Sequence, residues 1–278
     1  MKKITRRTLL RTGLVSGLAL TAGSGYTATH HLELIRRDVP IAGLDGSLDG
    51  LTVGVLSDFH AGGGSLSPED VTTAVATVNA QRPHLVTLLG DFVDEGPVDP
   101  EIRNFLFTSL GRLKAPLGVY AVLGNHDQWQ SPAAVRKELR RESITLLNNC
   151  SRQVAPGLVL AGIDDYQWGH PDLGLALKEI PDGPSAILLS HNPDINQELR
   201  DERVKLVLSG HTHGGQIRIP GVDWAPWVHC APKYHGPGGL IREGPHRWTF
   251  LTKGVGTRLL PIRIACPPDV AVLTLRRV

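Results

Sequence analysis

Five short runs of apolar residues, each followed at once by a polar residue, constrain the fold of this 278-residue chain more than any other feature. Runs of five to seven largely apolar residues are typical of strands that are buried on both faces. They lie at residues 51–57, 84–90, 118–124, 185–190 and 204–210, and they lead into Asp58, Asp91, Asn125, His191 and His211. Ligands bind outside the carboxyl ends of strands in open α/β sheets. We therefore expect these five polar side chains to converge on one site.

Helical segments fall between the predicted strands, which favours an α/β fold. The clearest helix start is Ser67, which is expected to act as N-cap with Pro68 in the first turn. The other predicted helices span residues 101–113, 131–141, 172–179 and 193–200. Toward the C-terminus, residues 216–219, 247–253 and 269–276 have strand character without intervening helices. We therefore expect a mixed sheet.

Composition and charge are those of an ordinary globular chain, with 41% hydrophobic and 20% charged residues. We find no internal repeat and no long polar linker after residue 50, so we expect one domain over residues 31–278. The formal net charge of +2 includes five basic residues that precede the first acidic residue, Glu33. Without these five, 24 of the 29 basic residues stand against 27 acidic ones. This faintly acidic balance predicts no nucleic-acid partner.

The first 30 residues predict an export signal. Residues 1–11 are basic and polar and residues 12–25 are mildly apolar, which is the order found in signal peptides. The apolar part is shorter than the ~20 residues that a membrane-spanning helix needs. Residues 5–10 (TRRTLL) resemble a twin-arginine signal, so we expect the twin-arginine export machinery to carry the chain to the periplasm or to the outer face of the cytoplasmic membrane. The leader is either cleaved near residues 22–28 or kept as an anchor at the membrane surface.

The polar residues at the predicted strand ends form a set of metal ligands. Asp58 and His60 are alternate residues at a strand end, so they point the same way and can reach one ion. The whole set is Asp58, His60, Asp91, Asn125, His191, His211 and His213. Carboxylate, amide and imidazole groups without a thiolate suit Mn²⁺, Fe²⁺/³⁺ or Zn²⁺. Phosphate-binding loops, serine-hydrolase elbows and aromatic-rich basic stripes are absent from the sequence, which leaves nucleotide-driven motors, serine hydrolases and RNA-stacking modules without support.

These residues stand in five short motifs that occur in a fixed order. The motifs are D-x-H at 58–60, G-D-x-x-D at 90–94, G-N-H-D at 124–127, His191, and G-H-x-H at 210–213. The ordered set resembles the pattern of the calcineurin-like metallophosphoesterase family, and segments 232–234, 254–256 and 261–263 are similar to an exported bacterial branch of it. The resemblance spans roughly residues 50–275. It implies a four-layer α/β/β/α sandwich with two mixed sheets and two divalent metal ions at the strand ends.

The resemblance also implies roles for individual residues. One metal is held by Asp58, His60, Asp91 and His213, and the other by Asp91, Asn125, His191 and His211. Asp91 thus bridges the two ions. His126 stands just outside the ligands, where it stabilises the transition state or protonates the leaving oxygen, and Asp127 orients its ring. We interpret Asp94 as a turn or helix cap rather than a ligand.

The substrate is predicted only as a class, a phosphorylated small molecule or a lipid-linked phosphate. Four tryptophans lie in irregular segments, where they either form an aromatic rim beside the metals or cover loop cores; they are Trp129, Trp168, Trp224 and Trp227. Related enzymes cleave monoesters, diesters and pyrophosphates. An exported enzyme fits a phosphodiester on an envelope lipid or wall polymer. The alternatives are a pyrophosphatase of the UDP-2,3-diacylglucosamine type, and a non-catalytic metal-bearing protein that binds the envelope.

Overall fold

The computed structural model describes residues 29–278 except 64, 96, 97, 131, 220, 221, 223, 226 and 227. The predicted export signal over residues 1–30 lies outside the described residues, save for its last two positions. Within the described part of the chain, no helix is long and apolar enough to cross a membrane.

The first sheet contains β1 (Glu33–Ile41), β2 (Thr52–Leu56), β3 (Leu85–Leu88), β4 (Val119–Ala121), β5 (Thr145–Leu146) and β12 (Asp269–Arg277). Its strand order is β1-β12-β2-β3-β4-β5. The strands β2 to β5 run parallel to one another, whereas β12 is antiparallel to β2 and parallel to β1. The sheet is therefore mixed, with its parallel half formed by the strands that precede Asp58, Asp91 and Asn125.

The second sheet contains β6 (Cys150–Ala155), β7 (Leu158–Gly162), β8 (Ser185–Leu189), β9 (Val204–Ser209), β10 (Gly239–Arg242) and β11 (Trp248–Leu251). Its order is β10-β11-β9-β8-β7-β6. The four central strands are parallel, and the two edge strands β6 and β10 are antiparallel to their neighbours. Both sheets are thus mixed, as the sequence predicts.

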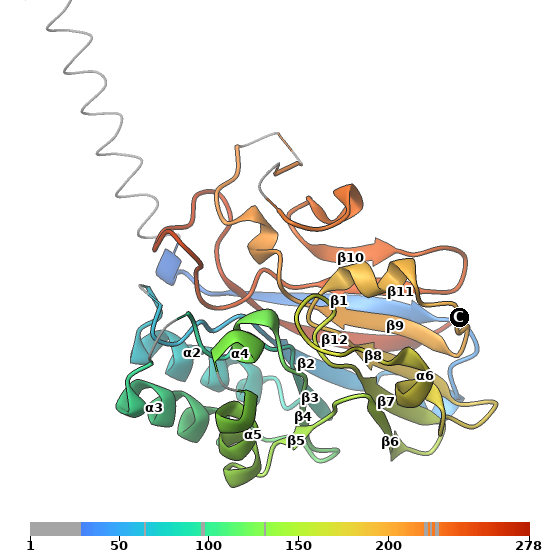
Figure 1. The fold of residues 1–278 in the computed structure, drawn as a ribbon. Helices are drawn as coiled ribbons and strands as arrows, with labels where there is room; N and C mark the ends of the chain where they lie inside the picture. The colour runs from blue at the N-terminus through green and yellow to red at the C-terminus, as the bar shows by residue number, and fades with distance from the viewer. Residues whose placement is uncertain are drawn as a thin grey trace, which may run out of the picture.

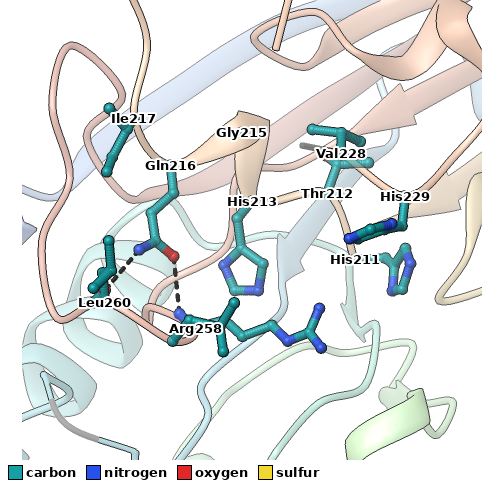
Figure 2. Close-up of a pocket in the computed structure, with 11 residues that line it drawn as sticks. His211, Thr212, His213, Gly215, Gln216, Ile217, Val228, His229, Arg258 and Leu260 are labelled. Carbon is teal, nitrogen blue, oxygen red and sulfur yellow. Dashed lines mark hydrogen bonds between the residues drawn. The ribbon is translucent and has the colours of Figure 1, made fainter. Parts of the chain in front are cut away.

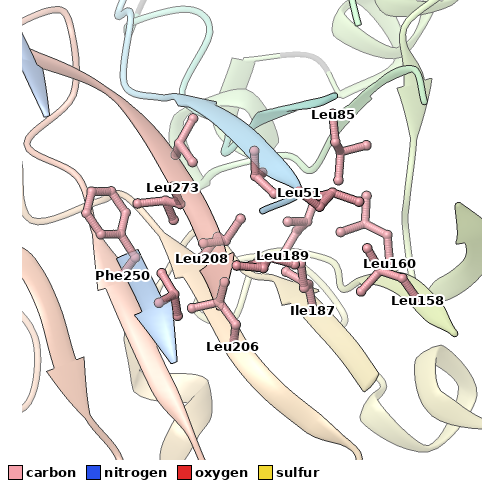
Figure 3. Close-up of a cluster of buried hydrophobic side chains, with 14 of the residues drawn as sticks. Leu51, Leu85, Leu158, Leu160, Ile187, Leu189, Leu206, Leu208, Phe250 and Leu273 are labelled. Carbon is pink, nitrogen blue, oxygen red and sulfur yellow. The ribbon is translucent and has the colours of Figure 1, made fainter. Parts of the chain in front are cut away.

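Alternating side chains on the strands divide the core into layers. In β2, Val53 and Val55 belong to the cluster between the two sheets, whereas Leu56 belongs to the cluster under the outer helices. In β8, Ile187 faces the other sheet and Leu188 faces outward. Figure 3 shows the cluster between the sheets, in which leucines from both sheets meet. Every central strand is therefore buried on both faces, which explains its continuous apolar sequence.

Helices cover the outer face of each sheet, so the molecule has four layers (Figure 1). Over the first sheet lie α2 (Pro68–Ala80), α3 (Pro100–Leu110) and α5 (Pro132–Arg141), and α4 (Asn125–Gln130) follows β4 directly. Over the second sheet lie α6 (Leu173–Leu177) and the 3₁₀ turn η2 (Pro193–Gln197). Three further 3₁₀ turns are η1 (Gly46–Leu48), η3 (His213–Gly215) and η4 (Pro232–Tyr234). The α/β/β/α sandwich is confirmed.

Local signals in the sequence explain where some helices begin and where two predictions fail. Ser67 caps α2 in a reciprocal capping box with Asp70, as its position predicts. The helix predicted over 193–200 is only the 3₁₀ turn η2, because the Asn196 side chain donates to the Pro193 carbonyl and competes with a helical ladder. The strand predicted over 216–219 is wrong, since it is reduced to a single bridge between Ile217 and Ile264.

The chain changes sheets once more near its end. β11 pairs with β9 in the second sheet, and the next strand, β12, pairs with β2 in the first. Residues 252–268 connect these strands across the end of the sandwich. We name this segment the crossing loop.

Candidate metal centre

All seven predicted ligand residues lie together at the end of the sandwich where parallel strands of both sheets finish. The first sheet contributes Asp58 after β2, Asp91 after β3 and Asn125 at the start of α4. The second sheet contributes His191 after β8 and His211 after β9. The remaining two, His60 and His213, stand two residues beyond Asp58 and His211.

Backbone strain is concentrated at these strand ends. Five of the seven residues have a left-handed backbone with φ between 49° and 68°: Asp58, His60, Asp91, His211 and His213. Aspartate and histidine tolerate this region better than most residues, although it remains costly. Such conformations persist where the surrounding structure enforces them, and they gather at functional sites. The backbone therefore turns sharply at each of these positions and directs the side chains into one cluster.

The first group of donors comprises Asp58, His60 and His213, whose candidate ligand atoms all lie within 4.8 Å of one another. The two imidazole Nε2 atoms of His60 and His213 are 3.0 Å apart. Asp58 Oδ1 lies 3.5 Å from His213 Nε2, and the same carboxylate accepts from the backbone N–H of His211. All three side chains are buried, so the group is fixed by the protein rather than by solvent.

The second group comprises Asp91, Asn125, His191 and His211. His211 Nδ1 lies 2.9 Å from Asn125 Oδ1 and 3.3 Å from His191 Nε2. His191 Nδ1 donates to the carbonyl of Leu89 over 2.6 Å, which leaves Nε2 to face the cluster. The carbonyl at the end of a buried strand therefore sets the orientation of this ring.

One oxygen of Asp91 lies between the two groups. Asp91 Oδ2 is 3.1 Å from His191 Nε2 and 3.5 Å from His60 Nε2. The other oxygen, Oδ1, accepts from the backbone N–H of His126 over 2.9 Å, which fixes the carboxylate plane. This is the placement required of a carboxylate that bridges two cations.

The charges of the cluster fit bound divalent cations. Burial lowers the pKa of His211 to about 3 and that of His213 well below its usual value, so both rings are neutral and present lone pairs. Burial alone would lower the pKa of His191, but Asp91 raises it to about 10, which shows that positive charge is favoured here. His213 Nδ1 is buried without a hydrogen-bond partner among the described residues. Carboxylate, amide and imidazole donors so arranged suit Mn²⁺, Fe²⁺/³⁺ or Zn²⁺.

His126 lies beside the cluster, and Asp94 is its acidic neighbour. His126 Nδ1 lies 3.1 Å from Asp94 Oδ1, and the same oxygen is 3.4 Å from His60 Nδ1. Burial would raise the pKa of Asp94, but these two histidines hold it well below its usual value. His126 Nε2 is buried and has no hydrogen-bond partner in the described part of the chain. This nitrogen is therefore free to exchange a proton with a bound molecule.

The role predicted for Asp127 is wrong. Its carboxylate accepts from the backbone N–H groups of Phe92, Val93 and Gly124, and so ties the loop after β3 to the loop after β4. Burial raises its pKa to about 7, with Asp91 adding to the effect. Asp94 was interpreted as a turn or helix cap rather than a ligand, and the structure adds contacts of its carboxylate with the His126 and His60 rings. Sequence proximity favoured Asp127, whereas the turn after Asp91 places Asp94 against the ring.

Two glycines of the motifs leave room for the ligand carboxylates. A Cβ at Gly210 would collide with Asp58 Oδ2 and Ser57 Oγ, and a Cβ at Gly124 would collide with Asp91 Oδ1. The glycines before His211 and Asn125 are thus required by close packing between strand ends, across the two sheets at Gly210 and within the first sheet at Gly124.

The predicted aromatic rim is only partly assembled. Trp129 packs against His126 with ring centroids 4.6 Å apart, and Trp168 meets Trp129 edge-on at 5.3 Å. Trp224 instead stacks on His235, and Trp227 lies outside the described residues. The Trp129–Trp168 pair therefore borders the cluster on the His126 side.

Gln216 and Arg258, to which the sequence analysis assigned no role, lie beside the cluster. They line a cavity of about 400 Å³ together with His211 and His213 (Figure 2). The only sequence signal was indirect, since segments 254–256 and 261–263 on either side of Arg258 resembled the exported branch of the family.

The fold and the cluster together define a metal-dependent phosphoester hydrolase built on a four-layer sandwich. The model of calcineurin-like phosphoesterases matches residues 51–215. The chain is 32% identical over 292 residues to the uncharacterised metallophosphoesterase YkuE of Bacillus subtilis, with 99% of each chain covered. It is 31% identical over 228 residues to an uncharacterised metallophosphoesterase of Aquifex aeolicus, covering 79% of this chain and 83% of that one. The chain therefore belongs to the calcineurin-like phosphoesterase family.

A solved structure agrees with this fold. A dimetal phosphatase from Danio rerio superposes with a TM-score of 0.50 at 12% identity, covering 74% of this chain and 88% of that one. At this identity the similarity speaks for the fold alone. The family implies divalent metal ions, and the clusters of buried donors described above are the places that can hold them.

Proposed function

We propose that this protein hydrolyses a phosphodiester with two divalent metal ions bound at the strand ends. Asp58, His60, Asp91 and His213 would hold one ion, and Asp91, Asn125, His191 and His211 would hold the other. The single observation that carries the proposal is the position of Asp91 Oδ2 between the Nε2 atoms of His191 and His60. Two divalent ions bound there would supply Lewis-acid chemistry at the phosphoryl group and at a water molecule.

His126 is the general acid in this proposal. Its Nε2 is buried and has no hydrogen-bond partner in the described chain, whereas Nδ1 lies 3.1 Å from the Asp94 carboxylate. Asp94 orients the ring through this contact, which leaves Nε2 to carry the transferable proton. When the P–O bond breaks, the proton at Nε2 passes to the leaving oxygen. Water supplies the oxygen that joins phosphorus, and the products are a phosphomonoester and an alcohol.

The proposed substrate is a component of the cell envelope, either a lipid or a wall polymer. Support comes from the leader, whose Arg6-Arg7 pair and short apolar segment resemble a signal for the twin-arginine machinery. Delivery to the periplasm or to the outer face of the cytoplasmic membrane disfavours the UDP-2,3-diacylglucosamine alternative, because UDP-sugars are cytoplasmic. The non-catalytic alternative is disfavoured by the full set of donors and by the free Nε2 of His126.

The test is hydrolysis of bis-p-nitrophenyl phosphate and p-nitrophenyl phosphate by metal-stripped protein to which Mn²⁺, Fe²⁺ or Zn²⁺ is restored. We expect metal-dependent turnover, with the diester preferred. Asp91→Asn is expected to lose both bound metal and activity, whereas His126→Ala loses at least about a hundredfold in kcat and keeps its metal. Turnover that is indifferent to added metal would contradict the proposal, as would full activity of His126→Ala.

A further inference from the structure

The crossing loop passes over the metal centre because the two strands it connects lie in different sheets. It leaves β11 beside β9 and enters β12 beside β2, and these sheet neighbours precede His211 and Asp58. Hydrogen bonds confirm the close approach: Val255 N–H donates to the Ser57 carbonyl, and Gly256 N–H donates to the Asp58 carbonyl over 2.7 Å. The loop therefore holds the next residues, Thr257 to Pro261, at the entrance to the site.

Arg258 is a cation without an acceptor at this entrance. Its side chain is half-buried and forms no ion pair or side-chain hydrogen bond with any described residue, and its Nε is fully buried and unpartnered. The Arg258 side chain lines the same cavity as His211 and His213. Figure 2 shows it extending below His213 toward His211. A buried donor group in this state calls for an anionic ligand.

The backbone around Arg258 is held in place by two other side chains. Gln216 Oε1 accepts from the Arg258 N–H over 2.8 Å, while its Nε2 donates to the carbonyls of Leu260 and Ile262. Arg263 is completely buried and donates to the carbonyls of Lys253 and Gly256, among others. These hydrogen bonds therefore fix the backbone position of Arg258.

The cavity beside Arg258 has both polar and apolar lining residues. His211, His213 and His229 are among the polar ones, and the apolar ones are Ile217, Val228, Leu259 and Leu260. Leu259 is 87% exposed and has a left-handed backbone with φ of 60°. An apolar side chain held in an unfavourable conformation and presented to solvent beside a reactive centre indicates an apolar ligand.

We infer that the substrate is an amphiphilic phosphodiester that bridges these two features. Arg258 pairs with a non-bridging phosphate oxygen, and the cavity wall of Ile217, Val228, Leu259 and Leu260 takes the apolar group esterified to that phosphate. The inference rests on the proposed function, because it assigns the substrate class of the same site. The apolar group of the substrate itself occupies the apolar part of the cavity. A bare anion or a short-chain diester contacts Arg258 but leaves this apolar part unfilled.

The binding test uses two diester analogues in which a P–C bond replaces the bond to the leaving group, ethyl methylphosphonate and octyl methylphosphonate, below the concentration at which they aggregate. Each buried methylene strengthens binding about fourfold, so partial burial of the six additional ones is expected to lower the Kd at least about tenfold in calorimetry with the full metal-loaded chain. Equal Kd values for the two analogues would overturn the assignment of the apolar cavity, and this result needs no variant.

Two variants test the recognition of the anion and the recognition of the apolar group separately. The double exchange Leu259→Ser/Leu260→Ser is expected to reduce the octyl-to-ethyl affinity ratio to below about threefold, whereas Leu175→Ser, an equally apolar exposed exchange on α6, keeps the ratio. Arg258→Gln is expected to weaken both analogues by the same factor of about ten or more, with partial recovery in Arg258→Lys. An unchanged ratio in the double variant, or unchanged affinity in Arg258→Gln, would overturn the corresponding half of the inference.

Turnover measurements distinguish a failure of this inference from a failure of the proposed function. Ethyl and octyl p-nitrophenyl phosphate share one leaving group, so chain length changes recognition and leaves the chemistry alone. Turnover of both diesters at equal kcat/KM would retain the phosphodiesterase and remove the apolar specificity. Chain-length-dependent binding without turnover of either diester would remove the proposed function and leave an amphiphile-binding site.

Discussion

The two regions that enclose the site are built in different ways. The ligand side consists of strand ends locked by the ladders of two sheets, and its side chains are almost all buried. The crossing loop contains no strand. Backbone hydrogen bonds to Ser57 and Asp58 and the single bridge to Ile217 hold it, together with side-chain hydrogen bonds from Arg263 and Gln216 to its backbone carbonyls. Metal ions need donors fixed within fractions of an ångström, which rigid strands supply. Substrate recognition tolerates a separately anchored loop, which can vary without disturbing the metals.

The largest expected effect comes from the anchor of the crossing loop. Arg263→Met leaves several buried carbonyls without a donor, including those of Lys253, Gly254 and Gly256. We expect the free energy of unfolding in urea to fall by about 3 kcal/mol or more. Arg276→Met at the exposed end of β12 is the matched control and should change it little. A loss below about 1 kcal/mol would contradict the anchoring role.

The next effect concerns the rigidity of the ligand side. Gly210→Ala places a methyl group against the carboxylate of Asp58 and the hydroxyl of Ser57, so the first donor group cannot keep its geometry. We expect kcat/KM on bis-p-nitrophenyl phosphate to fall at least about a hundredfold, with less metal bound per chain. The control is Gly174→Ala on α6, which should retain activity. Unchanged metal content would show that the strand ends are less rigid than their packing indicates.

Asp94→Asn tests how His126 is held. Loss of the carboxylate beside Nδ1 removes the contact that orients this ring, so we expect kcat to fall about 10- to 100-fold with little change in KM. Asp38→Asn, at an exposed carboxylate on β1, serves as control. An Asp94→Asn enzyme with the wild-type kcat would exclude this role.

Gln216→Ala tests whether the crossing loop adapts independently of the metals. Its side chain makes three hydrogen bonds to the loop backbone, at Arg258, Leu260 and Ile262. We expect KM to rise several-fold and stability to fall by about 1–2 kcal/mol, while metal content stays unchanged. Metal content and KM are measured on the same sample. Metal loss in this variant would mean that the two regions are coupled.

The smallest expected effect is a pH dependence of the free energy of unfolding. It arises at Asp269, the first residue of β12, where the crossing loop ends. Burial raises the pKa of Asp269, although Lys253 and a hydrogen bond from Thr252 oppose the shift. The folded chain then holds a proton that the unfolded chain releases near pH 4, so this contribution is present at low pH and is lost as pH rises through the folded-state pKa. Asp269→Asn should remove that slope. Denaturant unfolding at several pH values between 4 and 6 provides the measurement, and an identical slope in the variant would refute it.

The sequence predicted the ligand side well because its signals are local. Each of the five predicted central strands is buried on both faces, so its sequence is a continuous apolar run. The first polar residue after each run lies at the site. All five predicted central strands are present, and their ends bring Asp58, Asp91 and His211 together. The edge strands β6 and β10 were not predicted, because they are half-exposed and lack a continuous apolar run. The strands β1 and β5 and the fully buried β7 were not predicted either.

What the sequence by itself determined is the α/β order, the strands and the residue types that meet at their ends. Only the tertiary structure decided that Asp94 and not Asp127 faces His126, because the turn after β3 brings a residue 32 positions earlier against that ring. Likewise, no local pattern places Arg258 at the entrance. Its position follows from β11 and β12 pairing in different sheets, and strand pairing depends on contacts between residues that are distant in the sequence.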